Sequence, residues 1–280
     1  MSMTTSAGSG APILRPEQVG PLLVQPVEDE SVAVQASTSV HTDSHDYRIP
    51  MVLADPTAGW VAEGSEIPAT DADLDEELVT PAKLAGLTII SRELSEDTNP
   101  EAAATVGAGL ARDIARKLDA AFFGSKGADV VQPAGLEDLL GVSTVSGAFT
   151  NTDPFSEAVA AAEQVGATVS SFVTDPATAL TLAKVKRATG SNEPLLGTDA
   201  MSPTRRTVLG LPLLVSPAVT VGTVWALPKA RVFVVIRSDA RIDVNPSVYF
   251  TSDRVAVRAT MRVGFGFAHP AAVVKITAPA

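Results

Sequence analysis

The clearest hydrophobic pattern along the chain predicts a long helix over residues 100–123. Apolar residues recur there every four positions, at Val106, Leu110, Ile114, Leu118 and Phe122. This spacing places them on one face of a helix. Asn99-Pro100-Glu101 has the residue types that begin helices, and Gly124 ends the pattern. Such a helix is about 36 Å long at about 1.5 Å per residue, so we expect it to span the whole subunit.

A second pattern alternates and predicts a long hairpin near the end of the chain. From Arg254 to Phe267, one set of alternate residues is apolar throughout, and the other set contains Arg254, Arg258 and Arg262. A period of two indicates a strand with one buried face. Residues 239–244 alternate in the same way, so we expect the chain to reverse between 245 and 253. The apolar face of this hairpin should pack on the long helix.

A mixed unit of short helices and strands is predicted over residues 150–230. One helix begins at Asp153-Pro154 and ends at Gly166, and another begins at Asp175-Pro176 and ends at Gly190. Apolar segments predict strands at 169–174, 208–215 and 219–227. The fold class is therefore α+β.

Two segments in the first third of the chain do not have the pattern of a packed element. Residues 1–35 carry a proline every four or five positions from Pro12 to Pro26, and proline disfavours helix interiors, so we expect an extended arm. Residues 60–78 contain seven carboxylates and no basic side chain. Glycine and proline interrupt this acidic segment, which we expect to project as a loop or ribbon. Residues 84–90 then predict a strand.

Composition narrows the class of protein. Hydrophobic residues make up 45% of the 280 residues, which indicates a globular chain. The absence of cysteine excludes disulfides, thiolate metal sites and cysteine nucleophiles. Residues 207–228 carry no charge but are interrupted by glycine and proline, so they predict short core strands rather than a membrane span. Residues 1–10 lack the basic and apolar regions of a signal peptide.

Charge is distributed unevenly along the chain. Residues 1–100 hold 4 basic and 17 acidic side chains (−13), residues 101–200 hold 7 and 12 (−5), and residues 201–280 hold 10 and 3 (+7), for a net charge of −11. One interpretation is that these are solvated faces. The other is that an acidic N-terminal part meets the basic C-terminal part of a neighbouring copy, since opposite patches steer association.

Motifs for catalysis or cofactor binding are not found in the sequence. There is no phosphate-binding loop with Gly-Lys-Ser/Thr and no Gly-x-Ser-x-Gly nucleophile elbow. Gly264-Phe265-Gly266-Phe267 lacks the third glycine of a dinucleotide-binding loop and lies in a strand pattern. His269 is one of only three histidines, and we expect it at a surface or interface. The sequence therefore predicts a protein that is not an enzyme and uses no cofactor.

Two clusters have the residue types of a metal site without its full pattern. His41 and His45, with aspartates nearby, could bind zinc, but no third strong ligand is adjacent. Residues 71–76 alternate carboxylates like a calcium loop, but Glu76 stands where that loop needs glycine. We interpret the first cluster as a solvated polar strand and expect no metal.

The three arginines of the alternating strand form a row, with about 13 Å between successive members at about 3.3 Å per residue. They could dock the acidic segment of a neighbouring copy, or they could pair with Asp239 and Asp243 across the hairpin. Sequence-specific binding of nucleic acid is less favoured, because the chain is acidic and only 5% aromatic. The inter-subunit interface predicted on this basis comprises Trp60, Glu63, Glu66, Asp71, Asp73, Asp75, Glu76, Glu77, Arg254, Arg258 and Arg262.

Three segments resemble the major capsid proteins of tailed bacteriophages, which have the Hong Kong 97 fold. They are Trp60–Pro68 followed by Thr80–Leu84, Ile90–Asp97, and Arg262–Phe265 continued by His269–Val273. Their order also matches, and the resemblance covers roughly residues 36–277. It implies an icosahedral shell of hexamers and pentamers that encloses double-stranded DNA.

The resemblance gives each predicted part a name. It implies an N-terminal arm (1–35), an E-loop with flanking strands (36–90), a peripheral domain (91–149) with a spine helix (100–123), an axial domain (150–230), a peripheral-domain β-hairpin (231–268) and a C-terminal strand (269–280). It also implies as partners a portal, a scaffolding or cement protein and, non-specifically, packaged DNA, but no membrane. Assembly in the host cytoplasm and location in the virion follow from the same resemblance.

Two departures from the family pattern change what the resemblance implies. No lysine lies between Arg48 and Lys83, and no glutamate follows Glu193, so we expect no lysine–asparagine crosslinks and a shell held together non-covalently. The arm is too short for the large N-terminal scaffolding domain of some members. The alternative is an encapsulin, a bacterial compartment with the same fold that encloses a cargo enzyme.

Overall fold

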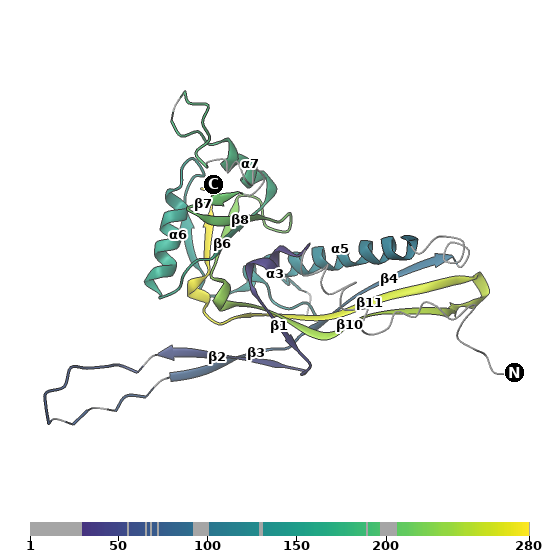
Figure 1. Ribbon diagram of the computed structural model, residues 1–280, viewed down its shortest axis with the longest axis horizontal. Helices are drawn as coiled ribbons and strands as arrows, with labels where there is room; N and C mark the ends of the chain where they lie inside the picture. The colour runs from purple at the N-terminus through teal and green to yellow at the C-terminus, as the bar shows by residue number, and fades with distance from the viewer. Residues whose placement is uncertain are drawn as a thin grey trace.

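The computed structural model has an elongated body from which a two-stranded ribbon leads away (Figure 1). It describes residues 30–54, 56–64, 66–67, 69–71, 73–91, 101–128, 131–188, 190–196 and 206–279. The arm expected over residues 1–29 and the helix-start signal at Asn99-Pro100 lie outside these ranges. None of the helices in the described ranges is both long and apolar enough to cross a membrane.

The larger part of the body is a four-stranded sheet with the order β1-β10-β11-β4. Its strands are β1 (Thr38–Thr42), β4 (Ala82–Ser91), β10 (Val232–Tyr249) and β11 (Arg254–Phe267). β10 and β11 form the predicted hairpin, which reverses through Phe250–Ser252 and Asp253. The hairpin is confirmed, but β10 begins at Val232, before the alternating segment seen in the sequence. β1 pairs in parallel with β10, and β4 pairs antiparallel with β11.

The predicted long helix is confirmed as α5 (Glu101–Phe123), which lies along the sheet (Figure 1). Its apolar face packs on the apolar face of β11, as expected. The buried residues of this contact include Ile114, Leu118, Phe122, Met261 and Phe265. The rings of Phe122 and Phe265 meet edge to face with centroids 5.1 Å apart. Each large apolar side chain buried in this way contributes roughly 1.5–3 kcal/mol to folding.

A short helix, α3 (Val32–Ala36), packs against α5 and corrects the expected extent of the arm. Residues 31–35 were predicted to be extended because prolines precede them. Instead Ser31 caps the helix, and Ala33, Val34 and Ala36 are buried. The buried carboxylate of Asp119 on α5 holds this helix in place, because it accepts hydrogen bonds from Ser31 Oγ (2.6 Å) and the Ala33 amide (3.0 Å).

The smaller part of the body is a six-stranded sheet with two helices. The strand order is β5-β12-β9-β6-β8-β7. The strands are β5 (Ser143–Ser146), β6 (Ser171–Thr174), β7 (Thr207–Val208), β8 (Leu211–Val215), β9 (Thr223–Leu227) and β12 (Val274–Thr277), and the helices are α6 (Asp153–Gln164) and α7 (Pro176–Lys184). Phe155 of α6 packs edge to face on Phe172 of β6, with ring centroids 5.1 Å apart. Short 3-10 helices at Leu136–Asp138, Lys229–Arg231 and Pro270–Ala272 connect the elements.

Three details of this unit differ from the sequence-based prediction. The helix α7 ends at Lys184 rather than near Gly190, because Val185 is extended and its carbonyl accepts the Leu195 amide at 2.8 Å. The predicted strand 208–215 is divided, because Leu209 and Gly210 adopt positive φ and turn β7 back onto β8. Finally, β5 and β12 belong to the same sheet as β9, so this unit includes residues on both sides of the expected range 150–230.

Candidate inter-subunit interface

The projecting ribbon consists of β2 (Tyr47–Ala54) and β3 (Asp73–Val79), which pair antiparallel (Figure 1). Tyr47 lies opposite Val79, and an ion pair joins Arg48 to Glu76 across the strands. The described residues between 56 and 71 connect the two strands and are all exposed. The sequence-based prediction of a projecting acidic segment is therefore confirmed for these residues.

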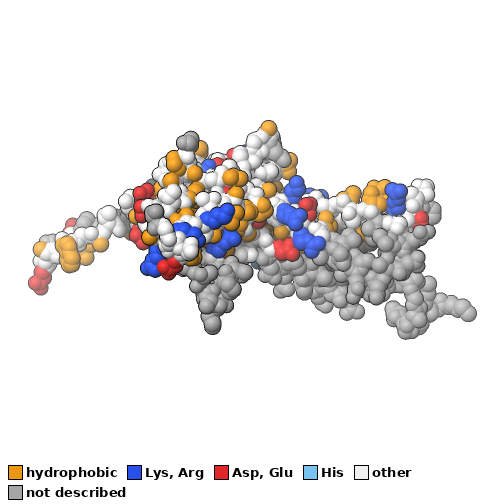
Figure 2. Space-filling model, turned by 90° about the horizontal axis from the view of Figure 1, so that it is seen from above, with side chains coloured by type: hydrophobic (Ala, Val, Ile, Leu, Met, Phe, Trp, Pro, Cys, Tyr) orange, Lys and Arg blue, Asp and Glu red, His pale blue; other side chains and the backbone are white. Residues whose placement is uncertain are grey.

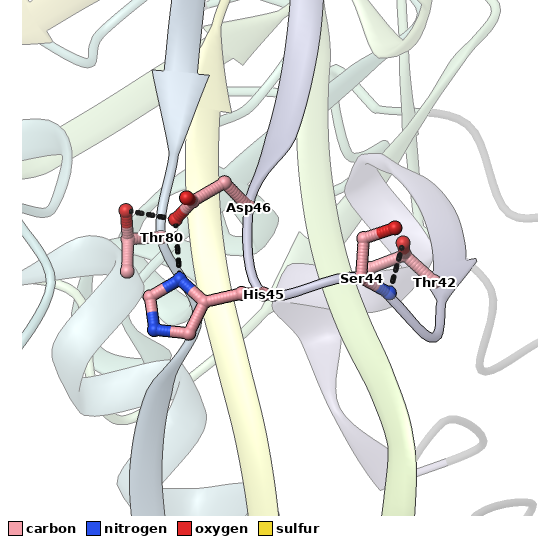
Figure 3. A network of polar contacts seen from close by, with 5 residues as sticks. All are labelled: Thr42, Ser44, His45, Asp46 and Thr80. Carbon is pink, nitrogen blue, oxygen red and sulfur yellow. Dashed lines mark hydrogen bonds and ion pairs between the residues drawn. The ribbon is translucent and has the colours of Figure 1, made fainter.

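A small polar network closes the base of the ribbon, as Figure 3 shows. Asp46, just before β2, accepts a hydrogen bond from Thr80 Oγ1 (2.7 Å), just after β3. His45 Nδ1 lies 2.9 Å from the same carboxylate oxygen. The hydrogen bond from Thr80, the contact with His45 and the charge of Arg48 together hold the pKa of Asp46 below its usual value. The charged form of Asp46 thus fastens the two ends of the ribbon to each other.

This network also accounts for one of the histidines considered as metal ligands. His45 is engaged with Asp46, whereas His41 lies in β1 opposite Ile236 of β10. Across the part of the chain that the structure describes, no group of three or more histidine, aspartate or glutamate side chains is arranged to hold a metal ion.

The foot of the ribbon rests on two glycines of β11. A Cβ atom at Gly264 would lie 2.6 Å from Val79 Cγ1 and 3.3 Å from Pro81 Cα, and one at Gly266 would lie 2.8 Å from Val79 Cγ2. Side chains at these positions would therefore lift the ribbon off the sheet. The two glycines of the Gly-Phe-Gly-Phe segment therefore allow β11 and β3 to pack closely. The alternating pattern alone did not reveal this role.

Glu77 differs from the other carboxylates of the predicted interface. Its Oε2 accepts a hydrogen bond from the Phe267 amide at 2.7 Å, within the same chain. Burial raises the pKa of Glu77, although the Phe267 amide opposes the shift. Asp75 and Glu76 on the ribbon, and Glu63, Glu66 and Asp71 nearer its tip, are exposed. Asp73 is placed by its backbone alone, opposite Ala54.

The tip of the ribbon combines apolar and acidic side chains. Trp60 has a relative exposure of 107%, and Ile67 is also largely exposed. Figure 2 shows orange and red side chains, but no blue ones, where the tip of the ribbon extends beyond the body. Large side chains of this kind are usually buried in a protein's core or in its interfaces. The tip therefore exposes large apolar side chains next to carboxylates.

The three predicted arginines lie on the face of the sheet that points away from α5. The strand register places Asp243 and Leu87 on either side of Arg258, Tyr249 and Ser91 on either side of Arg254, and Arg237 and Lys83 on either side of Arg262. Residues paired across strands share one face of a sheet. Leu87 (60% exposed) and Ile89 (42%) add apolar area to this basic face.

The register also gives each arginine of the row its neighbour across the hairpin. Arg258 lies opposite Asp243 in the hairpin. Arg254 and Arg262 lie opposite a tyrosine and an arginine.

The described residues thus present an exposed acidic ribbon and a sheet face that carries three arginines. Comparison with known families assigns the chain to a family. A model described as the phage capsid family matches residues 12–278, and the chain belongs to this family.

Individual relatives support the assignment. A capsid polyprotein of Pseudomonas phage PAJU2 is 28% identical over 199 residues, which are 66% of this chain and 29% of that protein. The chain thus spans less than a third of the length of this curated relative. The family model and this relative, a capsid polyprotein, do not favour an encapsulin.

Solved structures share the fold at low sequence identity. A structure from Microbacterium phage Oxtober96 matches with a TM-score of 0.71 and 20% identity, covering 89% of this chain and 91% of that one. The capsid of an empty GTA particle computed with C5 symmetry matches with a TM-score of 0.74 and 19% identity, covering 100% and 96%. A structure from Mycobacterium phage Adephagia matches with a TM-score of 0.69 and 16% identity, covering 89% and 90%.

Proposed function

We propose that this protein is the major capsid protein of a tailed phage and that its copies assemble into an icosahedral shell enclosing double-stranded DNA. The observation that carries the proposal is the family match over residues 12–278. In this proposal the β2–β3 ribbon is the E-loop, α5 is the spine helix of the peripheral domain, and the six-stranded unit is the axial domain of a Hong Kong 97 fold. Portal and scaffolding or cement proteins would be its partners in the virion, with non-specific contact to DNA.

Overexpression followed by negative-stain electron microscopy tests this proposal. We expect closed shells, or rings of five and six subunits, from the purified chain. An encapsulin would instead yield shells with a co-purified cargo enzyme, and that result would overturn the phage assignment.

We further propose that subunits join when the acidic ribbon of one copy lies on the basic sheet face of the next. Trp60, Glu63, Glu66, Asp71, Asp75 and Glu76 are exposed on the ribbon, and Arg254 and Arg258 are exposed on the sheet. Asp73 belongs to the same ribbon and Arg262 to the same face, whereas Glu77 anchors the ribbon to its own subunit. Opposite charges of this kind speed encounter and fix the register of a contact.

Charge reversal tests this contact. Replacing Arg254, Arg258 and Arg262 by glutamate should abolish or strongly reduce shells in electron micrographs while the circular dichroism spectrum stays that of a folded chain. The matched control replaces Arg112, Arg116 and Arg206, exposed arginines outside the proposed contact, by glutamate and should assemble normally. Normal shells from the first variant would refute the docking contact.

The shell should hold without covalent crosslinks. The ribbon contains no lysine between Arg48 and Lys83, so the nucleophile for a lysine–asparagine bond is missing there. Assembled particles boiled in detergent should run as one band near the chain mass of 28.8 kDa. A ladder of dimers and higher species resistant to boiling would contradict this prediction.

A further inference from the structure

A cavity of about 180 Å³ opens at the edge of the larger sheet, between β4, α5 and the segment 131–133. β4 is the last strand in the sheet order. Leu84 of β4, Leu118 and Ala121 of α5, and Val131 give the cavity apolar walls, while Lys83 and Lys117 add two cationic groups. Both lysines are exposed. The cavity is therefore apolar inside, with Lys117 of α5 and Lys83 of the edge strand β4 at its border.

The size and chemistry of the cavity suit one aromatic side chain. An apolar protein cavity of about 150 Å³ is large enough to bind benzene. A lysine ammonium over an aromatic face is most favourable when that face belongs to tryptophan. An indole would thus fill the apolar space and offer its ring face to the lysine ammonium groups. An aliphatic side chain such as Ile67 would fill the space but has no ring face.

The ribbon tip offers a side chain of this kind with matching charges beside it. Trp60 is fully exposed, and Glu63 and Glu66 follow within six positions and are exposed too. The sequence has no lysine or arginine between Arg48 and Lys83. Figure 1 shows that the ribbon leads away from its own body. The tip therefore does not face the cavity of its own chain.

We propose that Trp60 of one subunit inserts its indole into the cavity between β4 and α5 of a second copy of this chain. Glu63 and Glu66 of the inserting tip then lie beside Lys83 and Lys117 of the receiving copy. This inference rests on the proposed shell assembly and names one specific contact within it. The contact is heterologous, because the tip and the cavity are different surfaces. Each subunit can therefore insert its own Trp60 into one neighbour and accept the Trp60 of another. The same contact can then repeat around a ring.

Thiol crosslinking tests the insertion directly, because the native chain has no cysteine. The chain carrying Trp60→Cys with Val131→Cys is assembled, inspected by electron microscopy and mildly oxidised. Val131 is 69% exposed and lines the cavity. Mass spectrometry of the digested shells should then find the peptide of position 60 joined to the peptide of position 131. The matched control pairs Trp60→Cys with Leu140→Cys, an 87% exposed position that does not line the cavity, and should give at least about tenfold less crosslinked peptide, since a disulfide needs Cα atoms within about 7 Å.

A second measurement keeps the native tryptophan, in case its loss prevents assembly. The chain holds two tryptophans, and Trp225 is buried, so the difference in fluorescence between the native chain and Trp60→Phe reports on Trp60. Acrylamide should quench this signal in unassembled subunits and at least about fivefold less in shells. Filling the cavity with Ala121→Phe should restore quenching or block shell formation.

The outcomes separate the insertion from the proposed function. Shells with the 60–131 crosslink and a protected Trp60 support both. Shells without that crosslink, in which Trp60 remains as accessible as in free subunits, overturn the insertion and leave the capsid function intact. Unassembled chains under every condition overturn the capsid function, and the insertion falls with it.

Discussion

Asp119 shows what a single residue does in the interior of this protein. It lies on the buried side of α5 with 6% exposure, and four groups donate hydrogen bonds to it. Two come from amides at the start of α3, and two come from the hydroxyls of Ser31 and Ser216. A buried carboxylate is tolerated only when hydrogen bonds replace its lost hydration. Asp119 thereby ties α3 and the segment after β8 to the long helix.

Removing this carboxylate should destabilise the subunit strongly. We expect Asp119→Ala to lower the free energy of unfolding by about 3 kcal/mol, because several buried donors lose their acceptor. Asp119→Asn keeps the shape and one acceptor oxygen, so it should cost clearly less. Urea unfolding of both variants provides the measurement, and a loss below about 0.5 kcal/mol for Asp119→Ala would show that α3 is held by other contacts.

Asp175 gives the fold a dependence on pH. It caps α7 through the amides of Ala177 and Thr178 and also accepts the amide of Gly222. Burial opposes its charge, but the Thr178 hydroxyl and these amides outweigh burial and hold the pKa of Asp175 below its usual value of 3.8. A lowered carboxyl pKa contributes stability above the unfolded pKa, and that contribution is lost as pH falls through the folded pKa.

The melting temperature should therefore fall as the pH drops below about 4, and Asp175→Asn should flatten this part of the profile. The variant should also lose roughly 1 kcal/mol near neutral pH, because the side-chain nitrogen of asparagine cannot accept the Gly222 amide while its oxygen caps the helix. Glu157→Gln, a change at an exposed carboxylate on α6, is the matched control and should leave the acid branch unchanged. An unchanged acid branch in Asp175→Asn would exclude this carboxylate as its source.

At the scale of elements, the sequence was most informative where one period continued over many residues. The four-residue recurrence gave α5 almost to its ends, and the alternation gave β11 with its buried face. Contacts between residues that are far apart in the sequence could not be predicted from such periods. The carbonyl of Val185 ends α7 by pairing with Leu195, and Asp119 organises α3, yet neither partner is marked by a local pattern.

The ribbon illustrates the same limit for the candidate interface. Its acidic composition predicted that it projects, and the row of arginines predicted a basic sheet face. The seat of the ribbon on Gly264 and Gly266 could have been suspected from two glycines on one face of an alternating strand. The Asp46–Thr80 contact joins residues 34 positions apart. It could be predicted only once the pairing of β2 with β3 was known.

The glycine seat gives a prediction at this scale. Gly266→Val should destabilise the chain by roughly 1–3 kcal/mol, as overpacking of a tight contact does, and should expose the ribbon to protease. Gly59→Ala is the matched control, because nothing lies within 4 Å of a Cβ atom there, and it should leave both properties unchanged. Equal protease resistance of Gly266→Val and the native chain would mean that the ribbon is held elsewhere.

At the scale of the whole molecule, the uneven charge becomes a property of assembly. The ribbon supplies negative charge at one end of the subunit, and the outer face of β10, β11 and β4 supplies positive charge. Charges exposed to solvent are screened over about 10 Å at about 0.1 M salt. A contact between copies that depends on them should therefore respond to ionic strength, whereas the apolar core should not.

Assembly should accordingly weaken as salt rises while the fold persists. Light scattering of purified subunits at rising sodium chloride concentration should show a falling yield of large particles, with circular dichroism unchanged. Shell yield that does not vary with salt would indicate that apolar contacts, such as the Trp60 insertion, dominate over the charged ones.

Cryo-electron microscopy of the purified, assembled protein would show directly how its copies join. We expect icosahedral shells in which the β2–β3 ribbon of each subunit lies on the outer sheet face of a neighbour. A chain that stays a monodisperse monomer or dimer at every salt concentration, and also when co-expressed with the products of neighbouring genes, would contradict this expectation.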